Sequence, residues 1–295
     1  MIAKGESMVS QNVRTEQALR GEILYGDDFS LKEIEQWFED ERDGYFNLSY
    51  ESNQAPPGEE HRYEYSELAE QHGYGWLPPK KFDKALGIGS AHGAELKPIL
   101  MRSQSVTVLE PAEGFAAQMI DGKPVTYVQP VASGVMPFES AAFDIAVCFS
   151  VLHHIPNVST VINEMFRVLK PGGYALIREP TLSMGDWRQP RRGLTKRERG
   201  IPLPIFRRLI EQAGFEVVRE TRCMFSLTSR LSHFLQRPVW TYKFIAALDA
   251  QVCKLPFWPG DYHATNFLQK FRPTAVAYVL RRPLTTSGQG TRCGG

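Results

Sequence analysis

Closely spaced glycines follow a short apolar segment in the first third of the chain. The segment Phe82–Ile88 predicts a buried strand, and Gly87, Gly89 and Gly93 mark the turn that ends it. Residues without a side chain let the backbone turn sharply into the helix expected at Ala94–Met101, whose first N–H groups are free to bind a ligand. We therefore expect a strand, a turn and a helix, with a ligand bound at the turn.

Strands and helices alternate through the rest of the chain. Further strands are expected at Ser105–Leu109, Val125–Val128, Phe143–Phe149, Tyr174–Ile177, Phe215–Glu220 and Thr274–Leu280. Further helices are expected at Leu31–Glu41, Arg62–His72, Ala112–Met119, Val158–Leu169 and Pro204–Ala213. This alternation predicts an α/β fold, in which a mostly parallel sheet carries helices on both faces.

Composition divides the chain into parts around one main domain. Residues 1–20 are polar and are expected to be a disordered lead-in, and residues 285–295, rich in Gly, Ser and Thr, a disordered tail. Residues 21–80 are expected to form an N-terminal helical cap. The main domain covers residues 81–284 and contains an aromatic insertion at residues 221–273, which could be a lid, a dimer surface or additional core.

An acidic residue stands where the second strand of the main domain ends. At the carboxyl end of a strand beside the glycine turn, the carboxylate of Glu110 can accept hydrogen bonds from both ribose hydroxyls of an adenosine. Glycine turns of this kind bind NAD, FAD and S-adenosylmethionine alike. The turn and Glu110 together therefore predict a cofactor that contains adenosine, without selecting one of these three.

A longer motif narrows the choice of cofactor. The stretch Met136–Ile155 contains MPF, FD and VLHHI, and LKPGG follows at residues 169–173. This combination resembles the class I S-adenosylmethionine-dependent methyltransferases, in particular their small-molecule, methyltransferase type 11-like group. The resemblance covers residues 82–180 closely and residues 200–280 loosely. It implies a Rossmann-like, seven-stranded, mostly parallel sheet whose last strand, Thr274–Leu280, runs antiparallel beside Phe215–Glu220.

The resemblance also implies a role for each matching position. The residues expected at the cofactor are Gly87, Ile88, Gly89 and Ser90 near its methionine part, Glu110 at the ribose, Pro111, Val131, Ala132 and Ser133 near the adenine, and Phe149 and Ser150 beside the sulfonium and the acceptor. The resemblance implies S-adenosylmethionine as the cofactor and no metal, because the departing sulfide is neutral and needs no stabilising ion.

Two positions depart from the family pattern. Ala85 stands where the family often has an acid that helps to hold the cofactor's amino group, and Asp83 lies two residues further back, more than about 6 Å along a strand. The adenine loop also lacks the aspartate that the family often has there. Either the affinity for the cofactor is lower, or the N-terminal segment supplies a contact through Arg62, Tyr63 or Tyr65.

Three residues are candidates for the base that a hydroxyl acceptor requires. His153 and His154 follow the strand Phe143–Phe149, and Glu179 ends the next one, so that all three are expected at the carboxyl edge of the sheet. The alternative for the histidines is that one caps or packs beside the following turn. The alternative for Glu179 is a salt bridge with a nearby arginine.

The acceptor is less defined than the cofactor. A basic run at residues 188–199 could bind a phosphorylated or nucleotide-linked acceptor, or could be a solvated loop. We expect a methyltransferase acting on a small acceptor, in particular a hydroxyl of a sugar, a glycan precursor or a secondary metabolite. The alternatives are an NAD(P)-dependent oxidoreductase, a relative that binds the cofactor without catalysis, and an RNA methyltransferase.

Charge and cysteine content limit the other partners. The net charge of +1 makes a nucleic-acid partner improbable. No apolar run reaches the ~18 residues of a membrane span, and no membrane partner is expected. The four cysteines form no C-x-x-C pair, which favours reduced thiols and a cytoplasmic protein. A homo-oligomer is compatible with the sequence.

Overall fold

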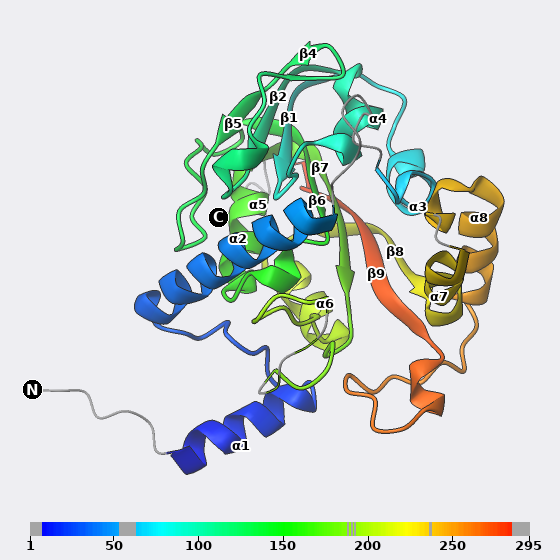
Figure 1. Cartoon of the computed structure of the whole chain (residues 1–295). Coiled ribbons are helices and arrows are strands. Elements are labelled where there is room, and N and C mark those ends of the chain that lie inside the picture. The colour runs from blue at the N-terminus through cyan, green and yellow to red at the C-terminus, as the bar shows by residue number, and fades with distance from the viewer. Residues whose placement is uncertain are drawn as a thin grey trace, which may run out of the picture.

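One seven-stranded sheet forms the centre of the protein (Figure 1). The computed structural model describes residues 8–52, 63–187, 189, 191, 193–235 and 238–284. In the order of the sheet, the strands are β5 (Thr126–Val128), β2 (Ser103–Leu109), β1 (Phe82–Ile88), β6 (Phe143–Phe149), β7 (Leu169–Pro180), β9 (Pro273–Arg281) and β8 (Glu216–Phe225). Strand β9 runs antiparallel to β7 and β8, whereas the other neighbouring strands are parallel. This confirms the Rossmann-like fold class and the reversed last strand.

Helices cover both faces of the sheet. One face packs against α5 (Val158–Val168) and α6 (Leu203–Gln212), and the other against α3 (Ser66–His72) and α4 (Lys97–Leu100). Successive residues of β6 point to opposite faces, so that Ala146 lies in the first core and Val147 in the second. Burial on both faces explains why β6 is apolar almost throughout.

The helix predicted at Ala112–Met119 is wrong. A 3-10 turn at Glu113–Phe115 is followed by a two-stranded hairpin, β3 (Met119–Ile120) and β4 (Lys123–Pro124). The hairpin turn is Asp121-Gly122, and both residues have positive φ, which is the geometry that an Asp-Gly pair adopts between antiparallel strands. The chain after β1 is also less helical than expected, because a 3-10 turn at Ala94–Leu96 precedes the four-residue helix α4.

The N-terminal part contains more helix than the sequence suggested. Residues 8–19, expected to be disordered, form α1 (Met8–Leu19), whereas residues 1–7 and 285–295 lie outside the described residues. Helix α2 (Leu31–Ser52) follows Ser30, whose N–H donates a hydrogen bond to the Glu33 carboxylate at 2.8 Å, one of the two contacts of a capping box.

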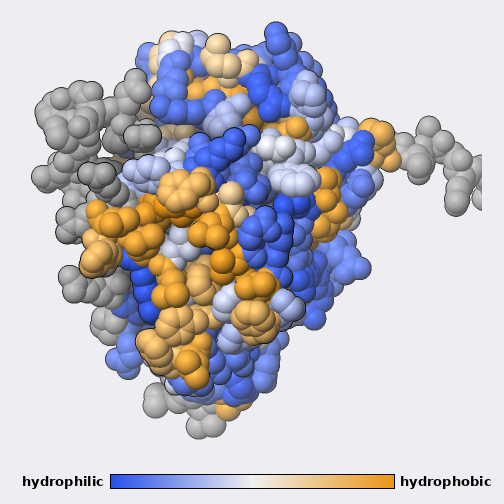
Figure 2. All heavy atoms as spheres, turned by 90° about the vertical axis from the view of Figure 1, so that its right-hand side faces the viewer, coloured by the Kyte–Doolittle hydropathy of each residue, from blue (hydrophilic) through white to orange (hydrophobic). Residues whose placement is uncertain are grey.

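The insertion at residues 221–273 is partly core. Strand β8 continues to Phe225, and α7 (Ser226–Leu235), a 3-10 turn at Val239–Thr241 and α8 (Lys243–Val252) follow. Val239 and Trp240 pack with Cys223 against Ala275 and Ala277 of β9. The outer side of α7 and α8 carries exposed apolar side chains, among them Phe234, Phe244 and Leu248, and forms an apolar face (Figure 2). Among the helices of the described residues, none has the length and hydropathy to span a bilayer.

Candidate active site

The glycine turn after β1 is packed closely against neighbouring side chains. Gly89 has φ +61° and donates its N–H to the carbonyl of Leu109 at 2.8 Å. A Cβ atom on Gly89 would lie 2.5 Å from Cγ1 of Val151, and one on Gly87 would lie 2.5 Å from Oγ of Ser90. Both positions therefore require glycine, one because of its conformation and both because of close packing.

Glu110 is held in a fixed position at the end of β2. Its two carboxylate oxygens accept hydrogen bonds from the N–H groups of Ala91 at 2.9 Å and Ala112 at 3.0 Å. Burial raises the pKa of this carboxyl group, although the two N–H groups oppose the shift. The side chain is thus bound to the glycine turn on one side and to the residues after β2 on the other.

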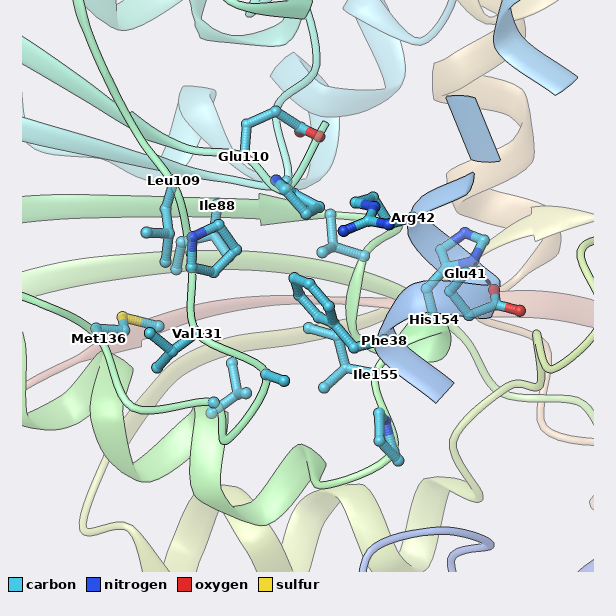
Figure 3. Close-up of a pocket in the computed structure, with 18 of the residues that line it drawn as sticks. Phe38, Glu41, Arg42, Ile88, Leu109, Glu110, Val131, Met136, His154 and Ile155 are labelled. Carbon is cyan, nitrogen blue, oxygen red and sulfur yellow. Dashed lines mark hydrogen bonds and ion pairs between the residues drawn. The ribbon is translucent and has the colours of Figure 1, made fainter. Parts of the chain in front are cut away.

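A cavity, here called the first cavity, opens beside Glu110 and the glycine turn (Figure 3). Seven of the residues expected at the cofactor line it, namely Ile88, Gly89, Glu110, Pro111, Val131, Ala132 and Ser150. Gly87, Ser90, Ser133 and Phe149 are not among the lining residues. Most of the remaining wall is apolar and includes Leu109 and Met136, so that the cavity suits a flat ring system beside a polar ribose.

Helix α2 forms the wall of the first cavity opposite the glycine turn. Phe38, Glu41, Arg42 and Tyr45 line the cavity from this helix, and Figure 3 shows Phe38 and Arg42 pointing into it across from Ile88. The sequence analysis missed this contribution. The helical spacing of residues 38, 42 and 45, which places them on one face, was the only signal in the sequence.

Hydrogen bonds fasten α2 to the loop after β6. Trp37 donates its Nε1–H to the carbonyl of His154 at 2.8 Å, and Nδ1 of His154 lies 2.7 Å from a carboxylate oxygen of Glu41. The second oxygen of Glu41 accepts the N–H of Arg197 at 2.7 Å. These contacts join α2, the loop after β6 and the loop at residues 195–199 into one buried polar cluster.

His153 lies between two carboxylates. Its Nδ1 is 2.7 Å from Glu179 and its Nε2 is 3.4 Å from Glu198. Burial disfavours the charged ring, but the hydrogen bonds and charges of Glu179 and Glu198 outweigh burial and raise the pKa of His153 to about 9. The same contact, against the effect of burial, lowers the pKa of Glu198 to about 2. His153 is therefore an imidazolium ion at neutral pH.

Glu179 shapes the loop after β6 rather than pairing with an arginine. One carboxylate oxygen accepts the N–H groups of Val151 and Leu152, both at 2.8 Å, and the other lies beside the His153 ring. The side chain is completely buried. The expected base function of His153, His154 and Glu179 stays a prediction. Both ring nitrogens of His153 and both carboxylate oxygens of Glu179 are already engaged by these contacts.

A second cavity meets the first one at the end of β6. Ser150, a residue with φ +59°, lines both cavities, and His153 lines the second. The wall of the second cavity also contains Ser183, His263 and Arg272. Ser150, which we expect beside the sulfonium and the acceptor, thus lies where the two cavities meet.

Aromatic residues before α3 surround a buried arginine at this junction. Arg178 donates from Nη2 to the hydroxyl groups of Tyr63 at 3.0 Å and Ser150 at 3.3 Å. Its guanidinium lies 4.8 Å from the ring centre of Tyr65 and 5.2 Å from that of Phe149. Phe149 thus covers Arg178. Two of the N-terminal residues that we considered do reach the site.

The other residues considered for a missing contact are elsewhere or undescribed. Asp83 lies near the start of β1, at the opposite end of the strand from the glycine turn, and its carboxylate is 3.4 Å from Lys170. Arg62 lies outside the described residues. Glu95, just after the turn, has a buried carboxyl group, and this burial raises its pKa to about 7.

The basic run at residues 188–199 is used for internal contacts. Arg197 and Lys196 pair with Asp40 of α2 at 2.7 and 3.0 Å. Arg191 donates to the carbonyl of Thr195 at 3.0 Å, and the buried Arg199 donates to backbone carbonyls, including that of Ile155 at 2.9 Å. Arg188 and Arg192 lie outside the described residues. The described cations of this run hold the loop in place and do not line the second cavity.

Comparison with known proteins adds the chemistry to this geometry. Residues 86–177 match the family model described as a methyltransferase domain. A ubiquinone biosynthesis O-methyltransferase of Pseudomonas putida is 30% identical over 95 residues, which cover 30% of this chain and 41% of that protein. A 24-methylenesterol C-methyltransferase of Oryza sativa is 36% identical over 94 residues, covering 29% of this chain and 26% of that protein. The chain therefore spans less than half the length of these curated relatives.

A solved structure supports the fold. A chain in the complex between the Haloferax volcanii Trm112 methyltransferase activator and a methyltransferase has a TM-score of 0.52 at 12% identity, covering 84% of this chain and 99% of that one. Sheet order and the glycine turn followed by Glu110 define a Rossmann-like domain of the kind that binds adenosine-containing cofactors. Within it, residues 86–177 match a methyltransferase domain, and the class of S-adenosylmethionine-dependent methyltransferases uses S-adenosylmethionine as its cofactor. The match favours a methyltransferase over the NAD(P)-dependent oxidoreductase.

Proposed function

We propose that the protein transfers a methyl group from S-adenosylmethionine to a small acceptor. The observation that carries this proposal is the meeting of two cavities at Ser150. The first cavity has the glycine turn and the buried carboxylate that an adenosine requires, and the second has space for another molecule. A donor in one cavity and an acceptor in the other would meet where the two spaces join.

The residues of the first cavity fit the cofactor. Glu110 would accept the ribose hydroxyls, and the apolar wall around Val131 and Met136 would pack against the adenine. Glu95 does not line the first cavity, but it follows the same glycine turn and is our candidate for holding the amino group, because Ala85 offers no carboxylate. When bound, the cofactor supplies an electrophilic methyl group and leaves as a neutral thioether.

The contribution of the protein to this reaction is alignment and exclusion of water. Helix α2 covers the first cavity, and its bonds from Trp37 and Glu41 to His154 keep it in place. A carboxylate can only accept a hydrogen bond, so in a neutral His154 ring the proton is on Nδ1 and Nε2 keeps its lone pair. His154 is therefore our candidate for accepting the proton of a hydroxyl acceptor, whereas His153 is already protonated at neutral pH.

The acceptor that we propose is a small molecule with a reacting hydroxyl, such as a sugar, a glycan precursor or a secondary metabolite. The printed names of the two curated relatives include an O-methyltransferase and a C-methyltransferase, and both support methyl transfer as the reaction class. A hydroxyl acceptor requires a base near the methyl group. His154, our candidate, lines the first cavity and not the second, so the reacting hydroxyl would have to extend past Ser150 to reach it.

Calorimetric titration with S-adenosylmethionine, S-adenosylhomocysteine and NAD tests the cofactor. We expect the first two to bind and NAD not to bind. Incubation with S-adenosylmethionine carrying a labelled methyl group and a panel of sugars, sugar phosphates and phenols tests the transfer. Label in an acceptor supports the proposal. Binding of the cofactor with no label transferred to any acceptor would instead favour a relative that binds the cofactor without catalysis.

A further inference from the structure

We propose that the acceptor carries an anionic oxygen group, a carboxylate or a phosphate, and that Arg272 binds this group in the second cavity. The inference rests on the proposed function in one respect, because it assumes that the second cavity holds the acceptor. It goes beyond that function by assigning a chemical class to the acceptor and a specificity-determining residue to the chain.

The charged side chains in the wall of the second cavity, Lys270 and Arg272, are both cationic. His153 and His263 also line the cavity, and the described residues of the wall include no aspartate or glutamate. His153 is protonated at neutral pH, but its two carboxylate neighbours balance that charge, so the net positive charge comes from Lys270 and Arg272. Two cationic side chains with no acidic residue in the wall attract an anion and disfavour a cationic acceptor such as an amine.

Arg272 is buried in the wall of the second cavity with few hydrogen-bond partners. Its side chain is only 2% exposed, yet no carboxylate lies within ion-pair distance of it among the described residues. One terminal nitrogen donates to the backbone carbonyl of Asp261, and Nε is buried without a hydrogen-bond partner. The carboxylate of Asp261 favours the charged guanidinium only from beyond ion-pair distance and accepts a hydrogen bond from Gln269 at 3.1 Å. A buried guanidinium without a direct ion pair is stabilised when an anion reaches it.

Another fully buried arginine shows how the chain satisfies such a group without a ligand. Arg199 also lacks a carboxylate partner, but it donates to five backbone carbonyls, among them those of Tyr25 at 3.0 Å and Pro156 at 3.1 Å. Arg272 has one carbonyl instead of five. The difference is that Arg199 is packed into loops, whereas Arg272 faces a cavity.

A further buried arginine, which has no carboxylate partner among the described residues, lies at the junction of the cavities. Arg178 is 3% exposed, and its Nε and Nη1 are buried without hydrogen-bond partners. Its Nη2 reaches Ser150, the residue shared by both cavities. Positive charge therefore extends from Arg272 in the wall of the second cavity to the place where the methyl group would be transferred.

The rest of the wall describes the body of the acceptor. Leu182, Met184 and Met224 provide apolar surface, and Tyr65 closes the side toward α3. Ser183 and His263 form a hydrogen-bonded pair at 2.7 Å that offers one further polar contact. An aromatic or otherwise apolar body with a carboxylate or phosphate at one end fits this wall better than an uncharged, fully hydroxylated sugar.

Small aromatic anions test the inference without knowledge of the natural acceptor. Benzoate, phenyl phosphate and the neutral benzamide would be titrated into the protein, with and without S-adenosylhomocysteine, and followed by ligand-observed NMR. We expect at least one anion to bind and benzamide to bind at least about tenfold more weakly, because a charged hydrogen bond is lost. The stronger of the two anions distinguishes a carboxylate from a phosphate site.

Variants assign the effect to Arg272. Arg272→Met is expected to weaken anion binding at least about tenfold and to leave benzamide unchanged. Arg272→Lys keeps the charge and is expected to retain part of the affinity. Lys243→Met, an exposed lysine of α8 outside the cavity wall, is the matched control and is expected to bind like the unaltered protein. Lys270→Met, at the cavity wall but exposed, is expected to have a smaller effect than Arg272→Met.

The outcomes separate this inference from the proposed function. Equal binding of benzoate, phenyl phosphate and benzamide would overturn the inference, and so would an affinity that Arg272→Met does not change. If Arg272→Met does not fold, Arg272→Lys replaces it. An anion affinity of Arg272→Lys equal to that of the control Lys243→Met would then overturn the inference. Binding of S-adenosylhomocysteine to the unaltered protein and to all variants is measured separately from anion binding. Its absence in the unaltered protein would contradict the proposed function and not the anion site.

Discussion

Replacing Glu198 by glutamine should lower the pKa of His153 and flatten the dependence of stability on pH. The carboxylate of Glu198 lies 3.4 Å from Nε2 of His153 and supports the imidazolium form together with Glu179. The amide of glutamine can still accept the ring N–H through its oxygen, but it carries no charge. Loss of the charge favours neutral His153 in the variant.

The size of the effect follows from the pKa values. The folded-state pKa of His153 is about 9, against 6.5 for an unperturbed histidine. Because the folded-state value is the higher one, this group stabilises the fold fully below pH 6.5, and the stabilisation is lost as the pH rises through 9. A shift of this size corresponds to about 3 kcal/mol of unfolding free energy at most. We expect Glu198→Gln to remove about 1 kcal/mol or more of this dependence.

Urea unfolding between pH 6 and about 9.5 measures this difference directly. The buried thiols of Cys148, Cys223 and Cys253 also make stability fall at high pH, because burial raises their pKa above that of an unfolded chain. They are the same in both proteins, so the comparison of the two pH profiles cancels them. Identical slopes for the unaltered protein and Glu198→Gln would refute the assignment of His153 as an imidazolium held by Glu198.

Other substitutions test the first cavity. Glu110→Ala should weaken binding of S-adenosylhomocysteine about 100-fold in calorimetry, from two lost charged hydrogen bonds of about 1.5 kcal/mol each; an unchanged Kd would exclude Glu110 from the ribose site. Gly89→Ala should cost about 1–3 kcal/mol in urea unfolding, because its Cβ would lie 2.5 Å from Val151 and its φ is positive. Gly122→Ala, with positive φ but open space around it, is the control and should cost less. Glu41→Ala should speed amide hydrogen exchange in α2, because the bonds to His154 and Arg197 are lost; unaltered exchange would show that α2 is held by other contacts.

The parts of the fold that the sequence predicted correctly are those with local signals. The strand at Phe82–Ile88 and the glycines after it agree with the structure, because burial pattern and turn chemistry are both local properties. The wrong helix at Ala112–Met119 shows the limit of such signals. Its apolar residues suggest a helix, whereas the Asp121-Gly122 pair just beyond it favours the hairpin that the structure contains.

The site was predictable where strand ends define it. Glu110 follows β2 and Ser150 follows β6, the two parallel strands on either side of β1, so their place at one edge of the sheet follows from the order of the strands. The contribution of α2 was not predictable in this way, since Glu41 and His154 are 113 residues apart in the chain and meet only through packing. Arg272 is a similar case, because its place in the second cavity depends on the position of β9 within the sheet.

The basic run at residues 188–199 shows that charge in a sequence does not identify its partner. The run contains several arginines, and the sequence favoured either an acceptor site or a solvated loop. In the structure, Arg197 and Arg199 are engaged by Asp40 and by backbone carbonyls. The cations that line the second cavity come instead from a part of the chain that has no conspicuous charge pattern.

A crystal structure with bound S-adenosylhomocysteine tests the central claim most directly. We expect the ribose hydroxyls at the carboxylate of Glu110, the adenine against Val131 and Met136, and the sulfur nearest to Ser150, where the two cavities meet. Ligand density at any other place, or a ribose that makes no contact with Glu110, would contradict the assignment of the first cavity as the cofactor site and of the second as the acceptor site.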